Sequence, residues 1–107
     1  MKTLKFRHNL ANLILDGTKT VTWRFFDDKD LKIGDKIELF DSDLKEKFAE
    51  AEIIKCREKK FGEIEEGDLV GHEKFQNKEE MLETYRKYYG EKVDWDALVK
   101  MINFKLL

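Results

Sequence analysis

Apolar and polar residues alternate along several short segments of the chain, which is the pattern of half-buried β-strands. One segment, 20–24, is rich in threonine, valine and tryptophan, residue types that suit a pleated strand. A longer apolar segment, 47–61, changes its alternation at Ile53 and Ile54, so it predicts either one long strand or two strands joined by a bulge. The predicted strands cover residues 3–6, 20–24, 36–40, 47–61 and 102–106.

A short helix is predicted between the first two of these strands. Leu10, Leu13 and Ile14 recur at i, i+3 and i+4, which places them on one buried face of a helix. Asn9 belongs to the residue types that cap helix N-termini. Gly17 can end the helix because glycine adopts the left-handed conformation without a clash at Cβ.

A longer helix is predicted over residues 77–89. Asn77 is a suitable N-cap, and Glu80 stands three residues later, where a capping box requires it. Gly90 then ends the helix. The apolar stripe of this helix suits packing against a core better than stacking on nucleic-acid bases. The stripe consists of Met81, Tyr85 and Tyr88, with Leu82 and Tyr89 beside it.

The order of these elements predicts an α+β fold. Adjacent strands in the middle of the chain favour antiparallel hairpins, and short strands in a chain of this size usually roll up to hide their edges. We therefore expect a mixed β-barrel of five or six strands with two main flanking helices. The 77–89 helix is expected to pack on the barrel through Met81, Leu82 and Tyr85, although the pattern alone also fits an open sheet.

Composition and length set the outer limits. The 107 residues are expected to form a single domain, 1–107, that buries roughly two thirds of its unfolded surface. No apolar run approaches the ~20 residues of a membrane span, and the first residues lack a signal-peptide core, so we expect a cytoplasmic protein with no membrane partner. The lone Cys56 excludes an internal disulfide, offers no zinc spacing and suits a core side chain better than a nucleophile.

Charge is unevenly distributed along the chain, whose formal net charge is −2. Residues 1–26 carry five basic residues and one acidic residue, whereas the remainder carries 16 basic and 22 acidic residues. A basic N-terminal part in an otherwise acidic chain fits a local anion-binding site, and it fits a solvated surface equally well. The five basic residues are Lys2, Lys5, Arg7, Lys19 and Arg24.

The segment from Gly17 to Arg24 carries the most specific motif of the chain. Gly17, Lys19 and Arg24 follow a leucine-rich helix with the spacing Gly-x-Lys-x-x-x-x-Arg. In physical terms, this is also what an ordinary helix-to-strand connection with solvated cations looks like. The motif, its place after the first helix and the order of elements resemble the ASCH domain over nearly the whole chain. The resemblance implies a PUA-like β-barrel, a role with RNA or modified nucleosides, and no cofactor.

The stretch Lys19-Thr20-Val21-Thr22-Trp23-Arg24 further resembles the Lys-Thr-x-Thr-x-Arg motif of the bacterial N4-acetylcytidine amidohydrolases, one branch of that family. This resemblance implies a catalytic lysine at Lys19, a catalytic threonine at Thr22 and a catalytic glutamate, for which Glu73 fits best. A desolvated lysine can take the proton of a hydroxyl nucleophile, so the chemistry is reasonable. The counterpart of the glutamate stays open among Glu73, Glu65, Glu66 and Asp68. The expected binding residues are Gly17, Thr20, Arg24 and Phe25.

Two features leave the function open. Phe25 and Phe26 stand where the amidohydrolase branch has an acidic, polar segment, and two phenylalanines suit either stacking on a base or plugging the end of a barrel. His72, beside a glycine and charged residues, is expected to be exposed, and no second ligand set for a metal accompanies it. A non-catalytic RNA-binding module and a ribonuclease therefore remain alternatives to an amidohydrolase. The sequence leaves open which nucleoside is bound, whether it is free or part of an RNA, and whether the protein has a protein partner.

Overall fold

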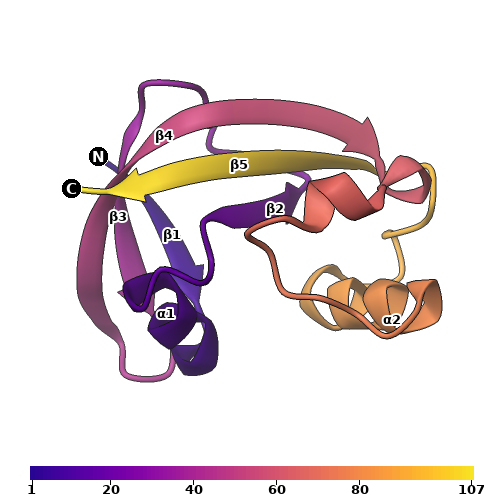
Figure 1. Ribbon diagram of the computed structural model, residues 1–107, viewed down its shortest axis with the longest axis horizontal. Coiled ribbons are helices and arrows are strands. Elements are labelled where there is room, and N and C mark those ends of the chain that lie inside the picture. The colour runs from indigo at the N-terminus through magenta and orange to yellow at the C-terminus, as the bar shows by residue number, and fades with distance from the viewer.

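In the computed structural model, which describes residues 1–107, the chain forms a curled five-stranded sheet flanked by two α-helices (Figure 1). The strands are β1 (Lys2–Phe6), β2 (Val21–Phe25), β3 (Lys36–Asp41), β4 (Glu46–Lys60) and β5 (Leu98–Leu106). The helices are α1 (His8–Leu15) and α2 (Lys78–Tyr89), with short 3-10 turns η1 (Phe61–Glu63) and η2 (Glu66–Leu69). The curled sheet is a half-barrel, which confirms the expected α+β class and barrel-like architecture.

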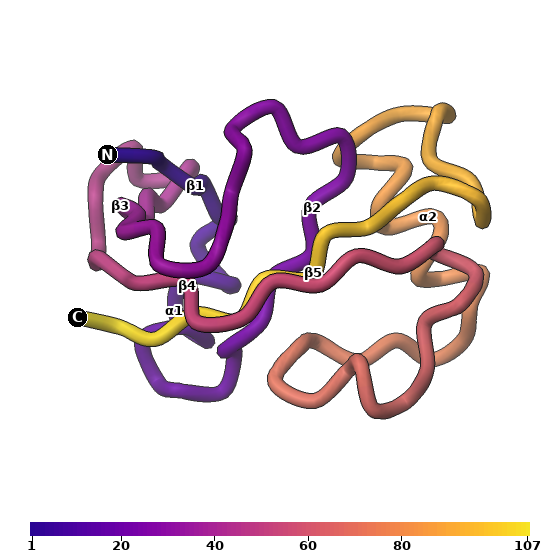
Figure 2. Tube along the Cα trace, turned by 90° about the horizontal axis from the view of Figure 1, so that it is seen from above, coloured from indigo at the N-terminus to yellow at the C-terminus, as the bar shows by residue number.

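The strand order in the sheet is β1-β3-β4-β5-β2. β4 and β5 form its long spine and run side by side in both views (Figures 1 and 2). They pair antiparallel, as do β3 with β4 and β2 with β5, whereas β1 and β3 pair in parallel. The outer edges of β1 and β2 have no strand partner, so the sheet curls without closing.

The long apolar segment in the middle of the chain forms the single strand β4, with an irregularity in its pairing to β5. The register shifts between Ile53 and Lys55, which confirms a bulge where the apolar alternation changes. Ile54 is turned outward with 49% of its surface exposed, whereas Ile53 is fully buried. Because a bulge bends and twists a strand, β4 can line both halves of the curled sheet.

The buried side chains form two clusters. One cluster joins α1 to β1, β3 and part of β4, and the other joins α2 to β2, β5 and η1. Met81 and Tyr85 are each 5% exposed and Leu82 packs beside them, as predicted for the buried face of α2. Tyr88 was expected in the same stripe but is 48% exposed, so its ring is available at the surface.

The two helices begin differently. Asn77 caps α2 as predicted, and its side chain accepts the N–H of Glu80 at 2.8 Å. The prediction of Asn9 as a cap is wrong, because α1 begins two residues earlier, with Arg7 at the cap position. Asp43 from the β3–β4 turn supplies the missing acceptor, 2.9 Å from the N–H of His8. Neither helix combines the length and the apolar character needed to cross a lipid bilayer.

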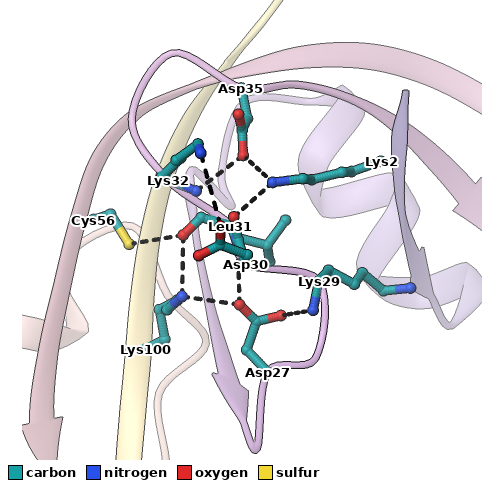
Figure 3. A network of polar contacts seen from close by, with 9 residues as sticks. All are labelled: Lys2, Asp27, Lys29, Asp30, Leu31, Lys32, Asp35, Cys56 and Lys100. Carbon is teal, nitrogen blue, oxygen red and sulfur yellow. Dashed lines mark hydrogen bonds and ion pairs between the residues drawn. The ribbon is translucent and has the colours of Figure 1, made fainter.

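Charged side chains fasten the connection between β2 and β3 to the sheet (Figure 3). Lys100 on β5 donates to the carboxylate of Asp27 at 2.9 Å and to the carbonyl of Leu31 at 3.0 Å. Lys2 on β1 donates to the carboxylate of Asp35 at 2.7 Å. Leu31 is buried, whereas Ile33 is 64% exposed and does not anchor the loop. Polar contacts therefore perform much of the anchoring of this connection.

Candidate functional site

Lys19 lies at the end of the turn that connects α1 to β2. Gly17 adopts a φ of +87°, which ends α1, and the N–H of Lys19 then bonds the carbonyl of Leu13 at 3.0 Å. This turn directs the lysine side chain inward, where only 3% of the residue is exposed. Its ammonium donates to the carbonyl of Val21 at 2.7 Å, so the cation is buried and held close to the backbone of β2.

Gly71 connects a distant loop to the start of β2. Its carbonyl accepts the N–H groups of Thr20 at 2.8 Å and Val21 at 3.1 Å. Gly71 has a φ of +79°, a region that side chains other than glycine rarely adopt. The turn brings Oε2 of Glu73 to 2.5 Å from Nζ of Lys19, across 54 positions of sequence. Hydrogen bonds from Thr20 and Val21 to Gly71 therefore hold the loop that carries Glu73 against the backbone next to Lys19.

Among the four acidic candidates, only Glu73 reaches Lys19. Asp68 is buried, but it pairs with Arg57 at 3.1 Å and Lys59 at 2.7 Å, away from the lysine. Glu65 and Glu66 are exposed to solvent. The geometry therefore selects Glu73 as the acid of this site.

A cavity of about 320 Å³ opens next to the Lys19–Glu73 pair, between α1 and α2. Its volume lies at the lower end of the range of small-molecule sites. The walls combine aromatic rings with cations. The lining residues are Lys5, Phe6, Arg7, Leu10, Lys19, Thr22, Trp23, Arg24, Ser42, Glu73, Tyr85, Tyr88 and Tyr89.

The expected site residues fall into two groups. Lys19, Thr22, Arg24 and Glu73 all line the cavity, although no hydrogen bond joins the Lys19 ammonium to the Thr22 hydroxyl. Gly17 and Thr20 lie outside the cavity and shape the backbone around it. Phe25, expected to bind a ligand, is 2% exposed and packs in the core against Phe61 and Tyr85, so its ring cannot stack on a ligand there.

Several solved structures match this fold, although comparison of the sequence alone finds no relative. No family model matches the chain, and no curated protein sequence is similar to it. Hypothetical protein PH0355 superposes with a TM-score of 0.76 and 22% identity over the whole of both chains. Protein EF3133 from Enterococcus faecalis V583, of family DUF984, gives 0.76 and 17% identity over 92% of this chain and 70% of that one. The ASCH domain from Lactobacillus crispatus JV V101 gives 0.72 and 16% over 98% and 79%.

The chain has the fold of the ASCH domain. In this ASCH fold the cavity lies where the two core clusters meet, since Phe6 belongs to one cluster and Trp23 and Tyr85 belong to the other. Side chains from β1, β2, α2 and the Glu73 loop therefore converge on one place. No group of three or more histidine, cysteine, aspartate or glutamate side chains is arranged to hold a metal ion.

Burial and charge act in opposite directions on the Lys19–Glu73 pair. Burial lowers the pKa of Lys19, and the neighbouring carboxylate of Glu73 offsets part of that effect. Burial alone would raise the pKa of Glu73, but the charge of Lys19 and its hydrogen bond to the carboxylate outweigh it, so the pKa of this carboxyl is lowered. Glu73 is therefore held in its ionised form, beside a lysine that loses its proton more easily than a solvated one.

His72 is buried, so the prediction that it would be exposed is wrong. Its ring stacks on Trp23 with centroids 3.9 Å apart, and only 6% of the residue is exposed. Nδ1 donates to the carbonyl of Glu73 at 2.9 Å, and Nε2 accepts the hydroxyl of Tyr85 at 2.9 Å. Burial, reinforced by the charge of Lys19, lowers the pKa of His72 to about 4. A neutral His72 thus links α2 to the backbone of Glu73.

This buried histidine predicts a loss of stability in weak acid. The pKa of His72 is about 4 in the folded chain against an ordinary 6.5, so the unfolded chain binds more protons between these pH values. The free energy of unfolding is therefore expected to fall by up to about 3 kcal/mol as the pH drops from 6.5 toward 4. Urea unfolding at several pH values measures this, and His72→Gln should flatten the slope in that window.

His8, the other histidine of the chain, is the matched control. A hydrogen bond to Asp41 raises the pKa of His8, so its stabilising effect is present below pH 6.5 and is lost as the pH rises. His8→Gln should therefore change the slope in the opposite sense to His72→Gln. Identical slopes in the parent and His72→Gln would show that folding does not lower the pKa of His72.

Several cavity residues were not expected from the sequence as site residues. Lys5 and Arg7 were counted in the basic N-terminal part, but only the curl of the sheet brings them to the cavity. Phe6, Tyr85 and Tyr88 belong to segments whose pattern predicts core packing. The pattern cannot separate the two cases, because a residue that faces a cavity recurs with the same helical or strand periodicity as a core residue. For Lys5 and Arg7, the uneven charge along the chain was the one signal that pointed to this site.

Proposed function

We propose that the chain binds a modified nucleoside in this cavity and hydrolyses the amide of N4-acetylcytidine to cytidine and acetate. The observation that carries the proposal is the buried Lys19–Glu73 pair, 2.5 Å apart, on a cavity that Thr22 also lines. Perturbed, paired titratable groups in a concave site are typical of catalytic centres. The resemblance of Lys19, Thr22 and Arg24 to the amidohydrolase motif supports the same conclusion.

The walls of the cavity suit a nucleobase. Trp23 and Tyr85 form its buried end, where their rings lie 5.8 Å apart in a stacked orientation, and Phe6 and Tyr88 add aromatic surface. Bases stack on such rings with a contribution of about 1–3 kcal/mol each. An acetylated cytosine that enters this end brings its amide toward Lys19 and Glu73.

In the proposed reaction, Lys19 gives its proton to Glu73 as the ligand excludes water, and its neutral amine accepts the proton of Thr22. The Thr22 oxygen attacks the acetyl carbon, and the bond from that carbon to N4 breaks as N4 receives a proton from Lys19. Cytidine leaves. A water molecule then attacks the acetyl ester of Thr22 and gives one proton to Lys19. The bond from the acetyl carbon to the Thr22 oxygen breaks, that oxygen takes the second proton of the water, and acetate departs. Glu73 releases its proton to solvent, which restores the starting state. Burial of Lys19 favours the neutral amine that the first step needs.

Incubation of the purified chain with N4-acetylcytidine tests the proposal. We expect equimolar cytidine and acetate, separated and quantified by chromatography, because one amide bond is cleaved per turnover. Recovery of intact N4-acetylcytidine after long incubation would contradict hydrolysis. If the nucleoside then still bound, a non-catalytic binding module would replace the hydrolase, and cleavage of an RNA oligonucleotide would favour the ribonuclease.

A further inference from the structure

The cavity has an excess of positive charge that its one acidic residue does not neutralise. Four cations and one carboxylate line it, although the whole chain carries more acidic than basic residues. Lys19 pairs with Glu73, but Lys5, Arg7 and Arg24 form no ion pair. Elsewhere some partly buried cations are paired, as Lys2 is with Asp35 and Lys100 with Asp27. An uncompensated set of cations on a concave surface attracts anions.

Two of the unpaired cations are held by aromatic rings. The guanidinium of Arg24 lies 4.9 Å from the centre of the Phe6 ring, and that of Arg7 lies 5.9 Å from the centre of the Tyr88 ring. A ring restrains a guanidinium without cancelling its charge, so both groups remain available to an anion. Arg24 is also oriented by a 3.1 Å hydrogen bond from Nη2 to the carbonyl of Lys5, while its Nε is buried without a partner.

The unpaired cations and the reacting groups occupy different ends of the cavity. Lys19 and Thr22 are 3% and 4% exposed and mark the inner end, whereas Lys5, Arg7 and Tyr88 are exposed and mark the mouth. Asp41 and Asp43 are both engaged by His8, Asp41 by Nδ1 at 2.6 Å and Asp43 by the backbone N–H at 2.9 Å. An anionic group at the mouth would therefore meet unpaired cations while its neutral, aromatic part reached the inner end.

We propose that Lys5, Arg7 and Arg24 form a phosphate subsite at the mouth, so that the cavity takes a nucleotide in preference to a free nucleoside. The proposal rests on the proposed function for the base, and adds the phosphate as the second element that the site recognises. Guanidinium groups bind phosphate oxygens through paired, charge-assisted hydrogen bonds. The phosphate belongs either to a mononucleotide or to the backbone of an RNA.

Calorimetric titration with cytidine and with cytidine 5′-monophosphate tests the subsite. Neither probe carries an acetyl group, so the result does not depend on hydrolysis. We expect the monophosphate to bind at least about tenfold more tightly at low salt, because hydrogen bonds to charged groups are stronger than those between neutral groups. This advantage should shrink as salt is added. Cytidine 3′-monophosphate and the dinucleotide CpA, measured in parallel, distinguish a mononucleotide phosphate from an RNA backbone phosphate.

Arg7→Gln and Lys55→Gln form a matched pair of variants, since each removes one exposed positive charge and Lys55 lies on β4 outside the cavity. Arg7→Gln should reduce the ratio of monophosphate to cytidine affinity by about tenfold, and Lys55→Gln should leave the ratio unchanged. Equal affinity for cytidine and all three phosphorylated probes would overturn the subsite, as would an equal effect of the two variants. Hydrolysis of N4-acetylcytidine with no phosphate preference would overturn the subsite and leave the proposed hydrolase standing.

Discussion

Glu73→Gln is expected to slow hydrolysis of N4-acetylcytidine by a factor on the order of 10²–10⁴, the usual contribution of a positioned proton-transfer group. Glutamine keeps an oxygen that can accept the 2.5 Å hydrogen bond from Lys19 but cannot take its proton. The substitution therefore changes the chemistry while retaining the contact. Glu73→Ala is less informative, because it leaves the 3% exposed Lys19 without a counter-charge and with only the Val21 carbonyl as a partner. Removing one partner of a buried ion pair costs about 3–5 kcal/mol.

Lys19→Met and Thr22→Val should produce losses as large as that of Glu73→Gln. The triple variant should be no slower than the slowest single variant, because residues that act as one unit are not additive. Lys59→Met is the matched control, since it breaks a lysine–carboxylate pair of 2.7 Å with Asp68 outside the cavity. Parent-like rates in all three single variants would contradict the proposed roles. A comparable loss in Lys59→Met would mean that general destabilisation explains the effect.

Gly71→Ala is expected to destabilise the fold by roughly 3 kcal/mol and to separate Glu73 from Lys19. The φ of +79° alone costs a residue with a Cβ about 1–3 kcal/mol. A Cβ at this position would also lie 2.2 Å from Oγ1 of Thr20, so the Thr20 side chain, the strand or the loop must shift. Denaturant unfolding measures the first effect, and the rate of hydrolysis, or nucleoside affinity if there is no turnover, measures the second.

Two further variants separate these causes. Gly67 lies four positions before Gly71, in η2, with no atom within 4 Å of an added Cβ and without a positive φ. Gly67→Ala should therefore change the free energy of unfolding by no more than about 0.5 kcal/mol. Thr20→Ala combined with Gly71→Ala removes the 2.2 Å contact and retains the strained φ. The double variant should therefore regain part of the lost stability. Wild-type stability in Gly71→Ala alone would show that the loop accommodates a side chain without strain.

Local sequence was sufficient for much of the fold. The cap at Asn77, the buried face through Met81 and Tyr85 and the bulge at Ile53–Ile54 each follow from residues within a few positions of one another. Local rules failed at Asn9, where Asp43 from a turn 34 positions away satisfies the start of α1 instead. They also failed for the β2–β3 connection, because its anchors Lys2 and Lys100 come from opposite ends of the chain.

For the site, the sequence by itself determined the lysine and threonine on one short segment and a basic N-terminal part of the chain. Only the tertiary structure decided which acid approaches Lys19, because Gly71 binds the backbone of β2 through long-range hydrogen bonds. The same holds for His72. Its burial depends on Trp23 and Tyr85, which lie 49 and 13 positions away, and no local pattern encodes such a distance. Desolvation, and with it the pKa of a titratable group, is a property of the packed surroundings and not of neighbours in sequence.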